Sequence, residues 1–307
     1  MKSSRMLLIA LLLFCSGFSV AQVLPEVPAG AQAISLTGEP LFSPVAGQAL
    51  LDQQAAARAD YEKNPDDADN IIWYGRRTAY TGDYRGAIEI YSEGIEKFPD
   101  DPRLYRHRGH RYITIREFDR AIADLEKAAD LIEGKENEVE PDGMPNARNI
   151  PVSSLHGNIW YHLGLAYYLK QDWDNAYRAY KAGFDAGRND DNRVSTTHWL
   201  YSILRRKGDP DAAEAVLDAI SADMDIIENF SYHNLDLFYK GELTLAQLMG
   251  EGDGSPAGAA VVYGAANWHY YNGQTEKADE MLQALLDTPG WASFGYIAAE
   301  ADLAARR

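Results

Sequence analysis

Hydrophobic and polar positions after residue 65 form two successive helical patterns separated by a short polar turn. The first pattern places apolar or small residues three, four and seven positions apart, as one face of a helix requires: Ile71, Tyr74, Gly75 and Thr78. The second pattern has the same character, with Ala87, Tyr91 and Gly94. Between them, Gly82 can end one helix in a left-handed conformation and Asp83 can cap the next. This region therefore predicts a helical hairpin whose small residues let its two helices approach closely.

The hairpin pattern repeats along most of the chain. The small residue that opens each second helix recurs at a nearly constant spacing, with one longer step after the second member: Ala87, Ala121, Ala176, Ala213, Ala246 and Ala278. Self-similarity at a period of about 34 residues is typical of stacked helical hairpins. We therefore expect an all-α solenoid of about six hairpins, with the fifth one degenerate, and a final capping helix that covers the apolar end of the stack.

These patterns and the composition between them divide the chain. The predicted parts are a signal peptide (1–21), a tether rich in Pro, Ala and Gly (22–44), an N-terminal helix (45–64), two hairpins (66–133), an acidic inserted loop (134–154), two hairpins (155–220), two degenerate hairpins (221–289) and a capping helix (290–307). Because no helical period occurs in 22–44, we expect an extended conformation there.

The inserted loop accounts for the long step between Ala121 and Ala176, which is one period plus the segment 134–154. The loop follows the most basic hairpin and is itself acidic, with Glu136, Glu138, Glu140 and Asp142. Two interpretations remain open. The loop either folds across the binding groove and competes with a ligand, or it is a disordered, solvated connection.

The chain begins with the pattern of a secretory leader. Lys2 and Arg5 precede an apolar run from Met6 to Phe14 that is too short to span a bilayer, and small residues follow up to Ala21. This predicts cleavage after Ala21 and a periplasmic or extracellular protein without a transmembrane helix. A lipid anchor on Cys15 is disfavoured, because Phe14 stands where a lipobox requires a small residue.

Composition and motifs exclude several classes of function. The chain carries 46 acidic and 29 basic residues, a net charge of −17, which argues against nucleic acid as a partner. Cys15 is the only cysteine, so the mature chain has no thiol chemistry. His107 and His110 could reach one metal ion, but a third ligand is not evident. With no catalytic or phosphate-binding motif either, we expect a protein that is not an enzyme and that uses no cofactor or metal.

The repeats resemble the tetratricopeptide repeat (TPR) family. In the third hairpin, one residue set reproduces the signature of the family's first helix: Trp160, Leu163, Gly164 and Tyr167. Ala176 and Tyr180 follow at the family's spacing, while Arg108 stands where a packing Leu is expected. The resemblance implies a right-handed superhelical solenoid and a scaffold that binds proteins, with the first helices of successive hairpins lining a concave groove.

Helical spacing opposite the packing face predicts which residues line that groove. The candidates are Arg76, Tyr80, Arg103, Arg106, His110, Tyr161, His198 and Arg205. Arginine pairs well with carboxylates, so we expect a protein or peptide partner that is acidic or bears a carboxylate. Two alternatives remain. The arginines between 103 and 120 could pair instead with neighbouring acids such as Glu117 and Asp119, and groove aromatics such as Trp73, Tyr161 and Tyr168 could bind a glycan or cell-envelope polymer. Oligomers could form through the ends of the repeat stack.

Overall fold

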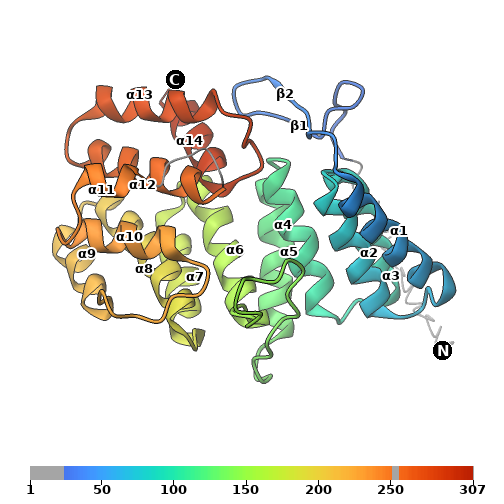
Figure 1. Cartoon of the computed structure of the whole chain (residues 1–307). Helices are drawn as coiled ribbons and strands as arrows, with labels where there is room; N and C mark the ends of the chain where they lie inside the picture. The colour runs from blue at the N-terminus through green and yellow to red at the C-terminus, as the bar shows by residue number, and fades with distance from the viewer. Residues whose placement is uncertain (1–23, 251–255, 307) are drawn as a thin grey trace, which may run out of the picture.

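The computed structural model of the chain describes residues 24–250 and 256–306, so the predicted leader lies outside the described residues. Within the described part, fourteen α-helices account for nearly all regular structure, and the helices stand side by side in an arched row (Figure 1). The predicted all-α repeat solenoid is confirmed. None of the described helices is long and apolar enough to cross a membrane.

The helices pair into six hairpins, which follow α1 (Gln48–Lys63) and precede α14 (Phe294–Ala305) in the described chain. The hairpins are α2 (Ala68–Tyr80) with α3 (Tyr84–Lys97), α4 (Pro102–Thr114) with α5 (Phe118–Leu131), α6 (Leu155–Leu169) with α7 (Trp173–Ala186), α8 (Asp190–Arg206) with α9 (Pro210–Val216), α10 (Phe230–Tyr239) with α11 (Leu245–Met249), and α12 (Pro256–Tyr271) with α13 (Thr275–Leu286). A short 3₁₀ helix, η1 (Leu217–Ala219), follows α9.

A left-handed residue follows the first helix in each of the six hairpins. In four of them it is glycine, the predicted kind of residue, with φ of 87° at Gly82 and 78° at Gly208, Gly241 and Gly273. In the second and third hairpins Arg116 and Gln171 take the same place, with φ of 69° and 59°. Residues other than glycine rarely adopt this backbone conformation, so other contacts must hold these two turns.

Small residues set how closely the paired helices pack, as the sequence pattern predicts. A Cβ atom added to Gly75 would lie 2.4 Å from the ring of Tyr91, and one added to Gly164 would lie 2.6 Å from the ring of Tyr180. The alanines that open the second helices are fully buried in five hairpins: Ala87, Ala121, Ala176, Ala213 and Ala278.

The prediction for the fifth hairpin is wrong in one respect. Ala246 is exposed, and Leu248 is the buried residue of α11, at 1% exposure. The reason is local: a capping box between Thr244 and Gln247 starts this helix, and it ends after five residues, so a different side chain faces the core.

The expected tether is instead a docked segment. Residues 24–47 fold back over the solenoid, where β1 (Ala33–Ile34) pairs antiparallel with β2 (Pro40–Leu41) and Ala33 pairs with Leu41. Ala33 and Leu41 are buried, and Ser43 donates a hydrogen bond to the carbonyl of Gly82 at 2.6 Å. The absence of a helical period correctly predicted that this segment is not a helix. It did not predict that the segment packs against the solenoid, which its small side chains allow.

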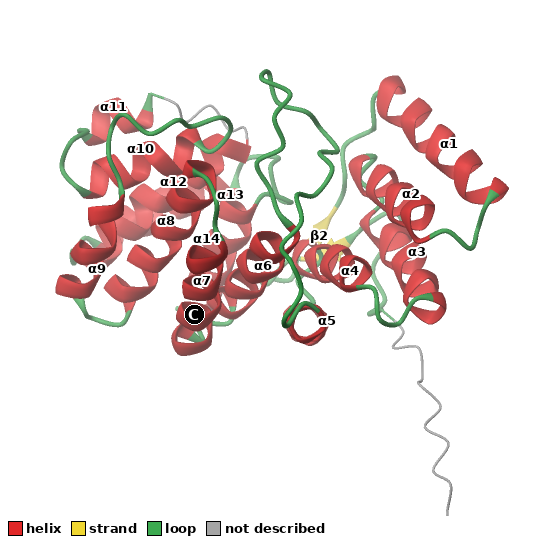
Figure 2. Ribbon diagram, turned by 90° about the horizontal axis from the view of Figure 1, so that it is seen from below, coloured by secondary structure: helices red, strands yellow, loops and turns green. Residues whose placement is uncertain are grey.

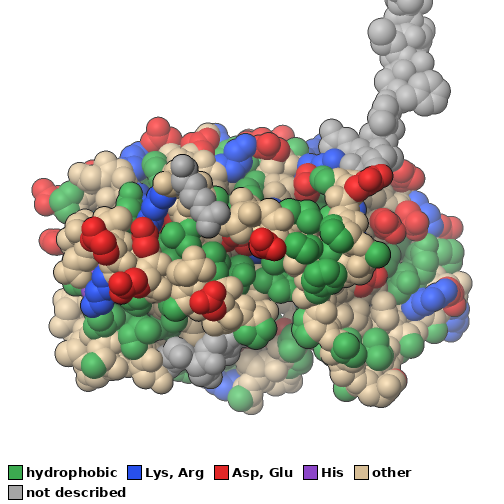
Figure 3. Space-filling view, turned by 90° about the horizontal axis from the view of Figure 1, so that it is seen from above, with side chains coloured by type: hydrophobic (Ala, Val, Ile, Leu, Met, Phe, Trp, Pro, Cys, Tyr) green, Lys and Arg blue, Asp and Glu red, His purple; other side chains and the backbone are tan. Residues whose placement is uncertain are grey.

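On the face seen from above, hydrophobic side chains gather toward the middle while acidic ones are scattered (Figure 3).

Helix α14 packs against α12 and α13, as a capping helix does, but its first turn reaches back to α6. A buried ion pair fixes it there: Arg116 Nη2 lies 2.6 Å from Glu300 Oε2, with the side chains only 3% and 1% exposed. The Glu300 carboxylate also accepts a hydrogen bond from the backbone of Leu36. One carboxylate therefore joins the second hairpin, the last helix and the docked N-terminal segment.

Candidate functional site

The concave side of the solenoid contains a cavity of about 340 Å³ lined by the first helices of four hairpins. Arg106 and His110 come from α4, Tyr161 and His162 from α6, and Asn192 from α8. Tyr232 of α10 and Phe294, the first residue of α14, also border it, together with Ser153 of the inserted loop and Glu228 in the segment before α10. Seen from below, the loops gather between α2 on one side and α6 and α14 on the other (Figure 2).

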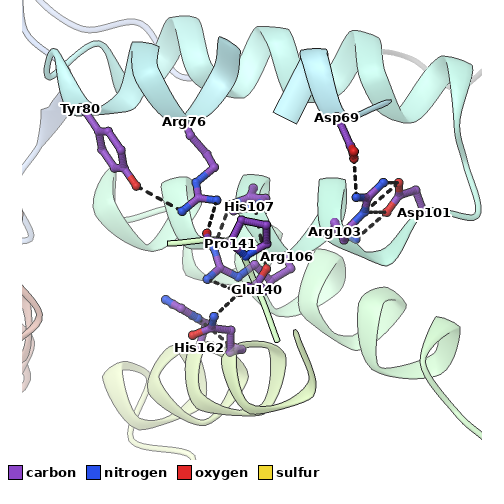
Figure 4. Close-up of polar contacts among 11 residues, drawn as sticks. Asp69, Arg76, Tyr80, Asp101, Arg103, Arg106, His107, Glu140, Pro141 and His162 are labelled. Carbon is purple, nitrogen blue, oxygen red and sulfur yellow. Dashed lines mark hydrogen bonds and ion pairs between the residues drawn. The ribbon is translucent and has the colours of Figure 1, made fainter. Parts of the chain in front are cut away.

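The inserted loop places a carboxylate on the arginine of this groove. Glu140 Oε2 lies 2.9 Å from Arg106 Nη2, and the two side chains are 10% and 11% exposed. Asn158 of α6 donates a further hydrogen bond to the same carboxylate oxygen. The loop is therefore ordered and lies across the groove, as one of the two interpretations predicts, while its competition with a ligand stays a hypothesis (Figure 4).

Two arginines of α2 hold the backbone of the same loop. Arg76 Nη1 donates to the carbonyl of Pro141 at 2.8 Å, and Arg77 Nη1 donates to the carbonyl of Gly143 at 2.9 Å. Tyr80 lies next to Arg76, whose Nη2 is 3.5 Å from the tyrosine oxygen. Predicted groove residues Arg76, Tyr80 and Arg106 are therefore brought together, with the loop as their occupant.

The far end of the loop is tied to the segment before α10. Arg148 forms an ion pair with Asp225 at 2.6 Å, and Asn146 donates to Glu228 at 2.6 Å. The loop thus spans the groove from the first hairpin to the segment that precedes the fifth. An isolated bridge between Val139 and Ser154 closes the part of the loop that lies between these two residues.

A histidine cluster lies beside the Arg106–Glu140 pair. The rings of His110 and His162 are 4.3 Å apart, and His107 stacks on Tyr91 at 5.6 Å. Burial is the main cause that lowers the pKa of all three imidazoles well below 6.5, and nearby arginines lower it further. The histidines are therefore neutral at pH 7, and Arg106 Nη1 donates to His107 Nδ1 at 2.7 Å. Among the described residues, groups of three or more His, Cys, Asp or Glu side chains placed to hold a metal ion do not occur.

Three predicted groove residues do not contribute as expected. Arg103 turns back to the cap of its own helix and to the preceding hairpin, with ion pairs to Asp101 at 2.6 Å and Asp69 at 2.5 Å (Figure 4). His198 is 1% exposed because α10 packs across α8, and burial lowers its pKa to about 3. Arg205 lies away from the groove arginines, over the ring of Tyr271 at 4.4 Å.

The arginines outside the groove follow the alternative in which they pair with acids of the protein. Arg108 forms a two-point pair with Asp124 at 2.7 and 2.8 Å, which explains how an arginine replaces a packing leucine. Arg120 pairs with Glu117 at 3.2 Å. Arg111 differs, because it forms no ion pair with any residue that the structure describes and lies 5.5 Å above the ring of Tyr84.

Tyr161 borders the groove, but its hydroxyl is already engaged: Trp199 Nε1 donates to it at 3.0 Å, and it shares a hydrogen bond with Tyr232 at 2.7 Å. Tyr168, a candidate for glycan stacking, is buried at 2% exposure. Sequence reasoning missed the aromatic residues Tyr84, Tyr232 and Phe294, which come from three distant segments and carry no shared pattern.

These three aromatic residues line a second, larger cavity of about 620 Å³. It shares five residues with the first cavity: His110, Glu228, Asn229, Tyr232 and Phe294. Its other boundary is the connection between α13 and α14, from Pro289 to Ser293. The concave side is therefore one continuous groove with a polar part at Arg106 and an aromatic part at Phe294.

No family model matches the chain. It is 25% identical over 141 residues to the BBSome complex member BBS4 of Bos taurus, and the alignment covers 46% of this chain and 23% of that protein. The chain thus spans under a quarter of the length of that curated relative.

Similar solved structures include two tetratricopeptide repeat proteins. YrrB, described as a TPR protein with an unusual peptide-binding site, is 18% identical with a TM-score of 0.42, over 76% of this chain and 91% of YrrB. A tetratricopeptide repeat protein of Parabacteroides merdae is 13% identical with a TM-score of 0.46, over 81% of this chain and 92% of that one.

Proposed function

We propose that this protein is a non-catalytic scaffold whose groove binds an acidic, carboxylate-bearing protein segment in the place that the inserted loop occupies. The observation that carries this proposal is the Glu140 carboxylate, held by Arg106 and Asn158 in a nearly solvent-free site. Charged hydrogen bonds of this kind are strong and directional, so the groove is organised to recognise a carboxylate.

The contacts along the loop support an exchange between it and an external segment. Arg76 and Arg77 hold backbone carbonyls, which any extended segment offers. The loop buries few apolar side chains, because Val139, Met144 and Ile150 are 65%, 67% and 43% exposed. A segment that adds apolar contacts to the same polar ones would therefore compete with the loop.

The predicted leader supports a second part of the proposal, which is that the protein is exported and acts in the periplasm or outside the cell. N-terminal sequencing of the protein recovered from its native host tests this, with Gln22 as the expected first residue. An N-terminus that retains Met1 would contradict it.

The binding proposal is tested by supplying the loop as a separate peptide. Residues 135–150 are replaced by a Gly/Ser linker, and a synthetic peptide with the sequence of residues 136–145 is titrated into this variant by calorimetry. We expect binding to the variant, and weaker binding to the intact chain, whose own loop competes. The matched control peptide carries Gln in place of Glu140 and should bind at least about tenfold more weakly, since a charge-assisted bond contributes about 1.5–3 kcal/mol.

Adding Arg106→Gln to the loop-replaced variant provides the second control. It should abolish the preference for Glu over Gln in the peptide while leaving the helix content unchanged by circular dichroism. Equal affinity of both peptides for the loop-replaced variant would refute a carboxylate site in the groove.

A further inference from the structure

The larger cavity, of about 620 Å³, has features that the acidic-segment proposal does not use. It lies beyond His110, away from the Arg106–Glu140 pair, and none of the residues that line it belongs to the inserted loop. Its volume falls within the range of about 300–1,000 Å³ that is usual for small-molecule sites.

The wall formed by residues 289–295 is held in place by contacts far apart in the sequence. Trp291 Nε1 donates to the carbonyl of Phe42 at 2.7 Å, and the carbonyl of Trp291 accepts from Arg116 Nη2 at 2.9 Å. Arg116 in turn forms the buried pair with Glu300. The cavity is therefore preformed, so a ligand does not have to order its walls on binding.

Aromatic rings supply the apolar surface of the cavity. Tyr84, Tyr232 and Phe294 line it and are only half-buried, and buried Trp291 supports Tyr84 edge-on at a ring distance of 5.5 Å. Phe294 is in turn supported by His110, with the ring centres 5.3 Å apart. Such rings offer flat faces on which a ring-shaped ligand can stack.

The polar groups of the cavity include both donors and acceptors. Glu228 contributes a carboxylate, and Ser231 and Ser293 contribute hydroxyls. Helices α10 and α14 both begin here, and their N-cap residues Asn229 and Ser293 make no side-chain capping hydrogen bond. Their first-turn amides therefore add donors near the acceptor Glu228.

We propose that this cavity binds a saccharide ring. A sugar hydroxyl donates and accepts hydrogen bonds at once, which matches a carboxylate that lies beside hydroxyls and free amides. The C–H face of a sugar matches the aromatic walls. Asn146 of the inserted loop already donates to one oxygen of the Glu228 carboxylate, so a purely apolar ligand would cover the rest of that charge without a further partner, and a free anion would be repelled by it.

Binding is tested with three probes, N-acetylglucosamine, cellobiose and, as an apolar ring without hydroxyls, indole. Saturation-transfer NMR detects contact, and a chemical-shift titration gives the affinity. We expect the two sugars to bind in the millimolar range or tighter and indole to bind more weakly. Stronger binding of indole would make the cavity an apolar pocket and overturn the saccharide proposal.

Variants locate the binding. Phe294→Leu and Glu228→Gln should each weaken sugar binding about tenfold or more, because the first removes a stacking face and the second an acceptor. Ala292→Phe should block the cavity without removing a wall. Phe230→Ala is the matched control, since Phe230 is 54% exposed on the same helix as Tyr232 but does not line the cavity, and binding should be unchanged.

Two results would overturn the proposal: the absence of sugar contact at tens of millimolar, or equal contact in the wild type and the Ala292→Phe variant. Thermal unfolding of each variant shows whether it is folded. The sugar assay uses the intact chain, in which Asn146 of the inserted loop holds Glu228, and it probes neither Arg106 nor Glu140. Its failure therefore leaves the acidic-segment proposal standing, and the reverse also holds.

Discussion

The buried pair of Arg116 and Glu300 makes a strong prediction about stability. Glu300→Ala should destabilise the protein by about 3–5 kcal/mol, because removing one partner leaves the other charge buried without compensation. The structure indicates that the loss of stability lies in the upper part of this range. Both side chains are almost fully buried, and two guanidinium nitrogens reach the carboxylate at 3.2 and 2.6 Å.

The turn conformation of Arg116 provides an internal comparison. Its φ of 69° favours glycine, so Arg116→Gly should cost less than Arg116→Ala by about 1 kcal/mol, although both remove the same ion pair. The double variant Arg116→Gly with Glu300→Ala should be destabilised by much less than the sum of the two single variants, because it leaves no unpaired charge.

Urea unfolding followed by circular dichroism measures these differences. The cost of Glu300→Ala should appear as a lower midpoint with little change in slope. A loss below about 1 kcal/mol for Glu300→Ala, or strictly additive single losses in the double variant, would show that the pair does not hold α14 in place. The cavity wall at Trp291 would then need another explanation.

Three further predictions concern packing and titration. Gly75→Ala should cost about 1–3 kcal/mol in urea unfolding, because the new Cβ atom would lie 2.4 Å from the Tyr91 ring, whereas Gly47→Ala, with no heavy atom within 4 Å, should change stability far less. Asp236 is fully buried, its carboxylate has no hydrogen-bond partner among the residues that the structure describes, and burial raises its pKa well above 3.8. In the folded state Asp236 therefore stays protonated at pH values where it has lost its proton in the unfolded state, so the stability of the protein falls as pH rises from 3.8 toward the folded pKa. Asp236→Asn should stabilise the protein by about 1–3 kcal/mol at pH 7 but not at pH 3.5. For His198, with a folded pKa of about 3 against 6.5, the sign is opposite: stability is lost as pH falls below 6.5. The other buried histidines add to this loss, and His198→Phe should make the loss between pH 6.5 and pH 5 smaller by about 1.5 kcal/mol in urea unfolding. An unchanged pH dependence in that variant would show that His198 is not buried as a neutral ring.

Local pattern was sufficient to predict the repeat. Gly82 ends α2, Gly75 packs on Tyr91, and five of the six alanines lie at helix contacts, because these features depend on neighbours within one period of the chain. The same reasoning failed at Ala246, where a local capping box starts a helix too short to continue the pattern.

The site was predicted only in part. Arg76, Tyr80 and Arg106 are brought together because they lie on first helices of adjacent hairpins, where helical spacing determines direction. His198 was misplaced because the degenerate fifth hairpin packs across α8, and hairpin spacing alone does not indicate how such a unit packs. The prediction for Arg103 was wrong because its guanidinium can pair with Asp101, the N-cap residue of its own helix, as easily as with a ligand.

What the sequence determines by itself is the solenoid: the repeat period, the turns between helices and the acidic insertion. Only the tertiary structure decides what lies in the groove. Glu140 reaches Arg106 from the inserted loop, and Arg116 of the second hairpin reaches Glu300 of the last helix. The physical reason is that repeat stacking is made of short-range contacts that each unit encodes, whereas the segments that fill the concave side are placed by single ion pairs and hydrogen bonds between distant residues, which leave no period in the chain.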